Sequence, residues 1–335
     1  MAKIPTTALV MHPLVQKEIM TPAHLDRLAL VTHLLSPEAV SSFAMLGDEA
    51  ADVDVLITSW GCPPLDAQVL DMCPRLKLIA HMAGSVKGFI DDAAWRRGIR
   101  VVNAVAAGAI PVAQYTVAAI LFANKQVFDL NRFYMDYREN RAPWTQEAPG
   151  LGNYGKTVGI VGASHVGRLV MQYLQPFNLK LLLYDPYVAP SEARSMGAMK
   201  MSLTEVLAKS DVVTLHAPLL EDTREMIGAR ELELMASGTT LINTAHGELV
   251  EQQALQRELV GGRLKAVLDV TTPEVLPADS PLYELPNVFL TPNVSGSLGA
   301  EVRRYGDVIV AEVERFSRGA ALKHLIRRDH LPRLG

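Results

Sequence analysis

The stretch "GIVGASHVGRLV", residues 159–170, decides the fold of this 335-residue chain. It follows an apolar run typical of a buried strand and opens a segment with helical periodicity. Gly162 permits a tight turn, Gly167 lets the helix pack close to the strand, and the small Ser164 stands where a second glycine is usual. Unpaired N–H groups at the start of a helix attract phosphate. The stretch therefore predicts a dinucleotide-binding turn; a plain strand-to-helix turn that needs small residues is the alternative.

An acidic residue at the end of the next apolar run supports the dinucleotide interpretation. Asp185 ends "LLLYD", 18 residues after Gly167. A carboxylate at this strand end accepts hydrogen bonds from ribose hydroxyls and repels a 2′-phosphate, so we predict NAD rather than NADP. The alternative role for Asp185 is that of a turn residue before Pro186. His216, in "LHAP", is expected to line the adenosine region.

Short apolar runs alternate with helical segments along the chain, which is typical of parallel α/β architecture. Strand-like runs cover residues 52–60, 76–82 and 99–104 in the first third. A second series covers 156–162, 179–185, 211–218, 238–245, 264–270 and 287–293. The pattern predicts an α/β fold with two Rossmann-like, doubly wound parallel sheets.

Two long helical segments flank the second series. Residues 111–140 have the length of a helix that bridges two domains, with Pro111 expected at its first turn. Residues 297–319 also show helical spacing of apolar side chains.

Composition limits the classes of function. Hydrophobic residues make up 49% of the chain, charged residues 20%, and the net charge is −4, which argues against a general nucleic-acid binder. Cys62 and Cys73 lack metal-ligand or disulfide spacing, so we predict no metal site and a reducing, cytoplasmic location. We expect no signal peptide, and we expect no apolar run of the roughly 18 residues that a membrane span needs. The prediction is a soluble protein without membrane or nucleic-acid partners.

Five ordered stretches carry a family resemblance. They are "AGSVKGF" (83–89), "GIVGASHVG" (159–167), "YDPY" (184–187), "LHAPLLEDTREMIGARELELMASGTTLINTAHGELV" (215–250) and "AVLDVTTPEVLPADSPLYELPNVFLTPNVSG" (266–296). Together they resemble the D-isomer-specific 2-hydroxyacid dehydrogenase family.

The resemblance implies a division into two domains. Residues 1–110 and 297–335 would form a flavodoxin-like substrate domain, and residues 111–296 an NAD-binding Rossmann domain. It also implies an active-site cleft between the domains, and a homodimer that pairs partly through the helix after Pro111.

The resemblance further implies which residues contact the cofactor. These are Gly162, Ser164, His165, Val166, Gly167, Asp185, Pro186, His216, Pro218, Thr223, Thr244, Ala245, Asp269 and Gly296.

The predicted catalytic positions depart from the family pattern. The family transfers a hydride to or from C2 of a 2-hydroxy or 2-keto acid, using an arginine, a histidine and a glutamate. Here the arginine position is His246, the histidine position is Asn293, and the glutamate is kept as Glu274. An amide cannot exchange a proton near pH 7, whereas an imidazole has a pKa of about 6.5. We therefore predict that His246 is a relocated acid/base whose pKa Glu274 raises, with Asn293 orienting the substrate oxygen.

Without that arginine, the substrate carboxylate needs another anchor. The backbone N–H groups of Gly84, Ser85 and Val86 are predicted to bind it. Lys87 adds a cation beside them; its alternative role is that of a solvated surface lysine.

Three further positions concern the substrate side of the site. His81 is a candidate cleft residue or a structural histidine, and Trp60 a pocket wall or part of the core. Gly108 stands where many relatives carry an asparagine.

The leading functional prediction is an NAD-dependent oxidoreductase with a diverged substrate. The alternatives are an NAD-binding protein with non-redox chemistry and a catalytically inactive regulatory homologue.

Overall fold

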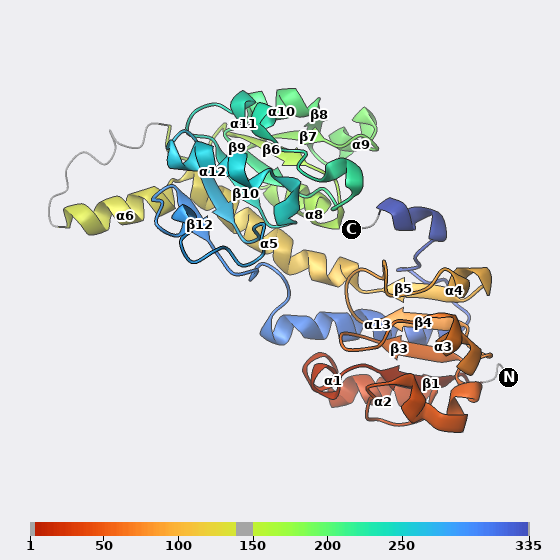
Figure 1. Ribbon diagram of the computed structural model, residues 1–335. Helices are drawn as coiled ribbons and strands as arrows, with labels where there is room; N and C mark the ends of the chain where they lie inside the picture. Colours follow the sequence, from red (N-terminus) through yellow and green to blue (C-terminus); the bar gives the residue numbers. More distant parts are fainter. Residues whose placement is uncertain (1–3, 139–149, 334–335) are drawn as a thin grey trace. The chain divides into compact units, whose positions relative to one another are not determined.

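The chain folds into two compact units, each built on a parallel sheet (Figure 1). The structure is a computed structural model that describes residues 4–138 and 150–333. The first unit takes its described residues from Met1–Gly108 and Ser297–Gly335, and the second from Ala109–Gly296. The first boundary between the units follows Gly108, whereas the predicted boundary follows residue 110. The expected interdomain cleft remains a prediction.

The first unit has a five-stranded parallel sheet. Its order is β2-β1-β3-β4-β5, formed by β1 Thr6–Val10, β2 His33–Leu34, β3 Val55–Thr58, β4 Leu78–His81 and β5 Arg100–Asn103. The sequence predicted the last three strands and missed β1 and β2. This order is the flavodoxin-like one, which has its topological switch point between β1 and β3.

Helices cover both faces of this sheet. One face packs on α1 (Pro13–Ile19), α2 (Pro22–Val31) and α13 (Arg303–Ser317), and the other on η1 (Phe43–Asp52), α3 (Ala67–Met72) and α4 (Ala93–Arg96). The strands alternate as a pleat requires: Val55 and Ile57 face the first layer, and Leu56 the second. The tail that was expected to be helical forms η5 (Gly299–Val302) and α13, and η6 (Arg328–Arg333) follows. The C-terminal helix therefore completes the core of the N-terminal sheet.

The second unit has a seven-stranded parallel sheet in the order β12-β11-β10-β9-β6-β7-β8. Its strands are β6 Thr157–Val161, β7 Lys180–Tyr184, β8 Ala198–Lys200, β9 Val212–Leu215, β10 Thr240–Asn243, β11 Lys265–Leu268 and β12 Val288–Leu290. All six predicted strands are present, and β8 is an additional edge strand. The order is that of a Rossmann sheet extended by one strand.

Two helical layers sandwich the seven-stranded sheet (Figure 1). One layer contains part of α5, α8 (His165–Leu174) and α9 (Pro190–Ser195), and the other contains α10 (Leu203–Lys209), α11 (Ala229–Leu234) and α12 (Gln252–Val260). Short helical turns lie in the loops: η2 (Glu221–Thr223), η3 (Gly247–Leu249) and η4 (Pro281–Tyr283).

The segment predicted as one helix over 111–140 differs from the prediction in two ways. Helix α5, Val105–Asn124, begins six residues earlier, so Pro111 lies inside it rather than in its first turn. Gln126 adopts a left-handed backbone (φ 49°) and separates α5 from α6, Val127–Tyr137. Residues 139 and 140 lie outside the described part of the chain.

Helix α5 also corrects a prediction about membranes. Its 20 residues carry no charge, and by length and composition alone it is long and apolar enough to cross a membrane. The expectation that no such run exists was wrong. Its buried side chains, among them Ala113 and Ile120, pack in the core of the second unit.

Candidate active site

The predicted dinucleotide turn joins β6 to α8, and two of its positions admit only glycine. Gly162 has φ +98°, and a Cβ there would lie 2.6 Å from the backbone nitrogen of Ala217. A Cβ at Gly167 would collide with the carbonyl oxygen of Gly162. Ser164 caps α8, since its Oγ accepts from the Gly167 N–H (3.4 Å). Its hydroxyl proton stays available to a phosphate at the helix N-terminus.

Asp185 lies where β7 ends and reaches the same turn. Its Oδ2 accepts from the Ala163 N–H and its Oδ1 from the Tyr187 N–H, both at 2.8 Å. Each carboxylate oxygen keeps a further lone pair, and no lysine or arginine in the described residues forms an ion pair with it. The glycine turn, the capped helix and this carboxylate fit the phosphates and the ribose of NAD.

Several other predicted cofactor residues are tied into the unit itself. The Thr223 hydroxyl donates to the Pro218 carbonyl (2.6 Å), and Thr244 Oγ1 lies 2.9 Å from Thr116 Oγ1. His216 is buried against the glycine turn, with Nε2 3.0 Å from Thr214 Oγ1. Burial lowers the pKa of His216 to about 3, so its ring is neutral at pH 7.

Three loops meet at the carboxyl ends of β10, β11 and β12. The Asp269 N–H donates to the Asn243 carbonyl (3.0 Å), and the Thr291 N–H to the Leu268 carbonyl (3.0 Å). Gly247 packs so closely on Thr271 that no Cβ fits between them. The predicted catalytic turn and the loop after β11 are therefore in direct contact.

Asp269 fixes the loop that carries Asn293. It is buried, and its Oδ1 accepts from Thr291 Oγ1 (2.6 Å) and the Val294 N–H (2.8 Å), while its Oδ2 accepts from the Ser295 N–H (2.9 Å). Asn293 is exposed and has a left-handed backbone, φ 53°, which asparagine tolerates better than most residues. The carboxylate thus holds the loop around Asn293 in place.

His246 is half-buried in the turn after β10. The Asn243 side-chain amide donates to its carbonyl (2.8 Å) and sets the turn. Burial lowers the pKa of the His246 imidazole, and the negative charge of Glu248 opposes that shift.

The predicted partner of His246 is different from the one in the structure. Glu274 is exposed, and among the described residues its carboxylate forms no ion pair with His246. Its carbonyl accepts from Thr271 Oγ1 (3.1 Å). The expectation that Glu274 raises the pKa of His246 was therefore wrong. Glu248, two residues along the same turn, is the acidic neighbour, and it was not predicted from the sequence.

In the first unit, His81 is a structural histidine. Its Nδ1 lies 2.9 Å from Thr58 Oγ1 and its ring packs on Phe89 with centroids 4.7 Å apart. Burial lowers the pKa of His81 to about 4, so it carries no charge at neutral pH.

The loop after β4 presents free backbone donors. The N–H groups of Gly84, Ser85 and Val86 donate to no acceptor in the described residues. The Gly84 carbonyl accepts from the Asn103 amide (3.0 Å), and Ser85 Oγ from the Lys87 N–H (3.2 Å). Lys87 itself is exposed.

Trp60 lies on the surface of the first unit, 46% exposed, rather than in its core. Its ring meets the ring of Tyr305 edge-on, with centroids 5.4 Å apart. Its carbonyl accepts from the His12 N–H (3.1 Å). Trp60 was predicted from the sequence, whereas His12 and Tyr305 were not, because nothing in their local patterns distinguishes them from helix-capping and core residues.

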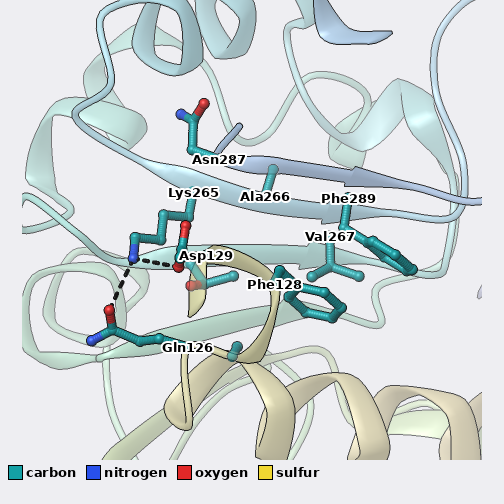
Figure 2. Close-up of a pocket in the computed structure, with 10 residues that line it drawn as sticks. Gln126, Phe128, Asp129, Lys265, Ala266, Val267, Asn287 and Phe289 are labelled. Atoms are coloured by element: carbon teal, nitrogen blue, oxygen red, sulfur yellow. Dashed lines mark hydrogen bonds and ion pairs between the residues drawn. The ribbon is translucent and has the colours of Figure 1, made fainter. Parts of the chain in front are cut away.

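A small pocket lies at the amino ends of the strands in the seven-stranded sheet, where β10 and β11 begin (Figure 2). Lys265 Nζ donates to Asp129 Oδ2 (2.7 Å) and to Gln126 Oε1 (3.3 Å), and the rings of Phe128 and Phe289 stack with centroids 4.4 Å apart. Dinucleotides bind at the carboxyl ends of such strands. This pocket therefore belongs to the packing of α6 on the sheet.

The Rossmann sheet, its glycine turn and Asp185 define an NAD-binding α/β protein. The chain belongs to the D-isomer specific 2-hydroxyacid dehydrogenase family, whose NAD binding domain matches residues 117–295.

Relatives of known name support this assignment. The chain is 30% identical over 297 residues to a glyoxylate reductase of Korarchaeum cryptofilum, which covers 88% of this chain and 89% of that protein. It is 28% identical over 316 residues to a D-3-phosphoglycerate dehydrogenase of Methanocaldococcus jannaschii, covering 93% of this chain. It spans only 46–59% of the length of the D-3-phosphoglycerate dehydrogenases that it matches. A phosphoglycerate oxidoreductase from Rhizobium etli, at 24% identity, has the same fold (TM-score 0.84; 97% of this chain and 99% of that one).

Proposed function

We propose that this protein is an NAD-dependent oxidoreductase of a 2-oxo or 2-hydroxy acid, with His246 as its acid/base. The observation that carries the proposal is the position of His246. It is half-buried at the carboxyl edge of the NAD-binding sheet, next to a carboxylate and in a turn that packs on the loop after β11. Function follows from such a site rather than from the fold alone.

The reaction requires a proton at the substrate oxygen. A bound cofactor would supply a hydride to C2 as NADH in the reductive direction, or accept one from C2 as NAD+ in the oxidative direction. His246 donates a proton to the oxygen in the reductive direction and accepts it in the oxidative direction. Asn293 cannot take that role, since its amide does not titrate, but it can hydrogen-bond the same oxygen.

The lowered pKa of His246 predicts how the rate of each direction depends on pH. Oxidation of a hydroxy acid uses the neutral ring as proton acceptor, so its rate should rise as the pH rises through this pKa. Reduction uses the imidazolium, so its rate should fall over the same range.

The substrate carboxylate needs donors other than an arginine at position 246. The free N–H groups of Gly84, Ser85 and Val86 are suited to an anion, and Lys87 adds a positive charge to the same loop. We assign the carboxylate to this loop.

The test is turnover with a panel of 2-oxo acids and NADH, and of 2-hydroxy acids with NAD. We expect activity on at least one acid, and His246→Gln should reduce it by roughly 10²–10⁴-fold. The double variant His246→Arg, Asn293→His should gain activity on glyoxylate. Tight NAD binding without turnover on any acid in either direction would contradict the proposal and support an inactive regulatory homologue.

A further inference from the structure

The first unit brings unassigned side chains together at its topological switch point. In a sheet of order β2-β1-β3-β4-β5, the crevice at the carboxyl ends of β1 and β3 is where ligands bind. Val10 and Thr58 are the last paired residues of these strands. Beyond them, the His12 N–H donates to the Trp60 carbonyl, and a Cβ at Gly61 would lie 2.6 Å from the His12 Cβ.

Tyr305, from α13, lies beside Trp60 at this switch point. Its ring meets the exposed ring of Trp60 edge-on at 5.4 Å. Its hydroxyl lies against Gly108, where a Cβ would come within 2.6 Å of the hydroxyl oxygen. That hydroxyl forms no hydrogen bond with any of the residues that the structure describes. Gly108 thus leaves room for a phenol in place of a side chain of its own.

His12 adds a polar group. It caps α1, and its Nδ1 accepts from the Leu14 N–H at 3.2 Å. Since Nδ1 accepts a hydrogen bond, a neutral ring carries its proton on Nε2. Nε2 donates to no acceptor in the residues that the structure describes. His12, Trp60 and Tyr305 together form what we call the aromatic edge.

The charges nearby do not suit a phosphate. Lys87 is the only lysine or arginine in the segments that directly follow β1, β3, β4 and β5. These segments are residues 11–12, 59–66, 82–90 and 104–108. Tight phosphate binding generally uses several charge-assisted hydrogen bonds, often from a bidentate arginine.

Two arginines precede Tyr305 on α13, and neither adds a free positive charge to the aromatic edge. Arg304 is paired with Glu301, with Nη1 and Oε1 3.6 Å apart. Arg303 lies two positions before Tyr305, which is about 200° around the helix and so on another side. The aromatic edge therefore offers the exposed ring of Trp60 and two hydrogen-bonding tips without a net cluster of positive charge.

We propose that the aromatic edge binds the side chain of the substrate, and that this side chain is aromatic or otherwise large and apolar rather than phosphorylated. Aromatic rings pack edge-on or offset with centroids 4.5–7 Å apart, and the exposed face of Trp60 offers such a contact. The Tyr305 hydroxyl and His12 Nε2 serve polar atoms of the substrate. The proposal rests on the proposed function and adds to it the class of acid that the site selects.

The experiment compares NADH-dependent reduction of three acids. Glyoxylate has no side chain and reports the basic chemistry, phenylpyruvate carries an aromatic ring, and 3-phosphohydroxypyruvate carries a phosphate. For the unaltered protein we expect kcat/KM for phenylpyruvate to exceed that for 3-phosphohydroxypyruvate by about tenfold or more.

Two variants test the named residues. Trp60→Ala should lower kcat/KM for phenylpyruvate by about tenfold, while glyoxylate changes by less than about threefold. Tyr305→Phe keeps the ring and should raise KM for phenylpyruvate by roughly two- to tenfold with kcat nearly unchanged. Leu30→Ala, which removes an exposed side chain of α2 in the same unit, is the matched control. It should change kcat/KM neither for phenylpyruvate nor for glyoxylate.

The outcomes separate this inference from the proposed function. Glyoxylate turnover with an unchanged phenylpyruvate-to-glyoxylate ratio in Trp60→Ala would overturn the aromatic edge and leave the proposed function standing. If no acid is reduced, calorimetric titration of phenylpyruvate into the NADH-loaded protein decides. Binding that is lost in Trp60→Ala supports the aromatic edge, and absence of binding to the unaltered protein refutes it.

Discussion

Burial lowers the pKa of three histidines at strand ends in this chain, and the degree of burial separates their roles. His81 and His216 are almost completely buried, with pKa values of about 4 and about 3, so both act as neutral hydrogen-bonding groups. His246 is only half-buried, and the negative charge of Glu248 opposes the lowering of its pKa by burial. Of these three, His246 is the ring that suits proton transfer.

The buried neutral state of His81 makes the protein sensitive to acid. Its pKa in the folded state, about 4, lies below the unfolded value of about 6.5, so the unfolded chain binds more protons between these values. Stability from this group is fully present above pH 6.5 and is lost as the pH falls toward 4, by on the order of 3 kcal/mol.

Urea unfolding between pH 7 and pH 4.5 tests this prediction. His81→Gln cannot be protonated and can still bond Thr58, so its free energy of unfolding should fall less steeply with acid than that of the unaltered protein. The exposed His33 provides the control, since His33→Gln should leave the slope unchanged. Equal slopes for His81→Gln and the unaltered protein would contradict the assignment of a buried neutral ring.

At the scale of elements, α5 braces two of the three loops of the candidate site. Thr116 bonds Thr244 at the end of β10, and the Tyr115 hydroxyl lies 2.7 Å from Thr291 Oγ1, which in turn donates to Asp269. This chain of hydrogen bonds leads from the helix to the loop of Asn293.

Removing one link of that chain tests the bracing. Tyr115→Phe should destabilise the protein by about 0.5–1.5 kcal/mol and raise KM for the substrate several-fold, because the Asn293 loop loses a support. NAD affinity should change less than KM. Tyr154→Phe, at an 89% exposed position of the same unit, is the control. A Tyr115→Phe protein with unaltered KM would show that the helix does not position Asn293.

The sequence allowed most elements to be predicted, and the misses have physical causes. Runs such as "KTVGIVG" and "LKLLLYD" are buried on both faces and therefore continuous, so β6 and β7 were recognisable. Edge strands are short and half-exposed: β2 has two residues and β8 three. The position of Pro111 was misjudged because a proline inside a long apolar helix looks the same in sequence as one in its first turn.

The candidate site was predictable only where motifs are local. The glycine turn and Asp185 depend on spacing within one βαβ unit, and the sequence displays that spacing. The resemblance suggested Glu274, whose distance from His246 depends on how separate loops pack. The acidic neighbour in the structure is Glu248, two residues from His246 in the same turn. Tyr305 lies far from Trp60 along the chain, and only the return of α13 to the first sheet brings them together.

For the molecule as a whole, α5 suggests how two copies associate. The helix carries no charged side chain, yet only 39% of its most apolar window is buried, and Phe122 is 50% exposed. Exposed apolar side chains that lie together on a surface can mark an interface between protein chains. We propose a homodimer that covers this helix.

Light scattering of the purified protein tests that proposal. We expect a particle of twice the 36.5 kDa of one chain, and Phe122→Asp should shift it toward a monomer. Leu30→Asp, at an exposed position of α2, should leave the mass unchanged. A monomeric unaltered protein at micromolar concentration would contradict the proposal.

The most direct test of the central claim is the pH dependence of kcat/KM for reduction of the best acid in the panel. If His246 is the acid/base, kcat/KM falls as the pH rises through a pKa below 6.5, oxidation rises through the same pKa, and His246→Gln loses both transitions. A profile that is flat over this range, or a transition that persists unchanged in His246→Gln, would show that the proton comes from another group.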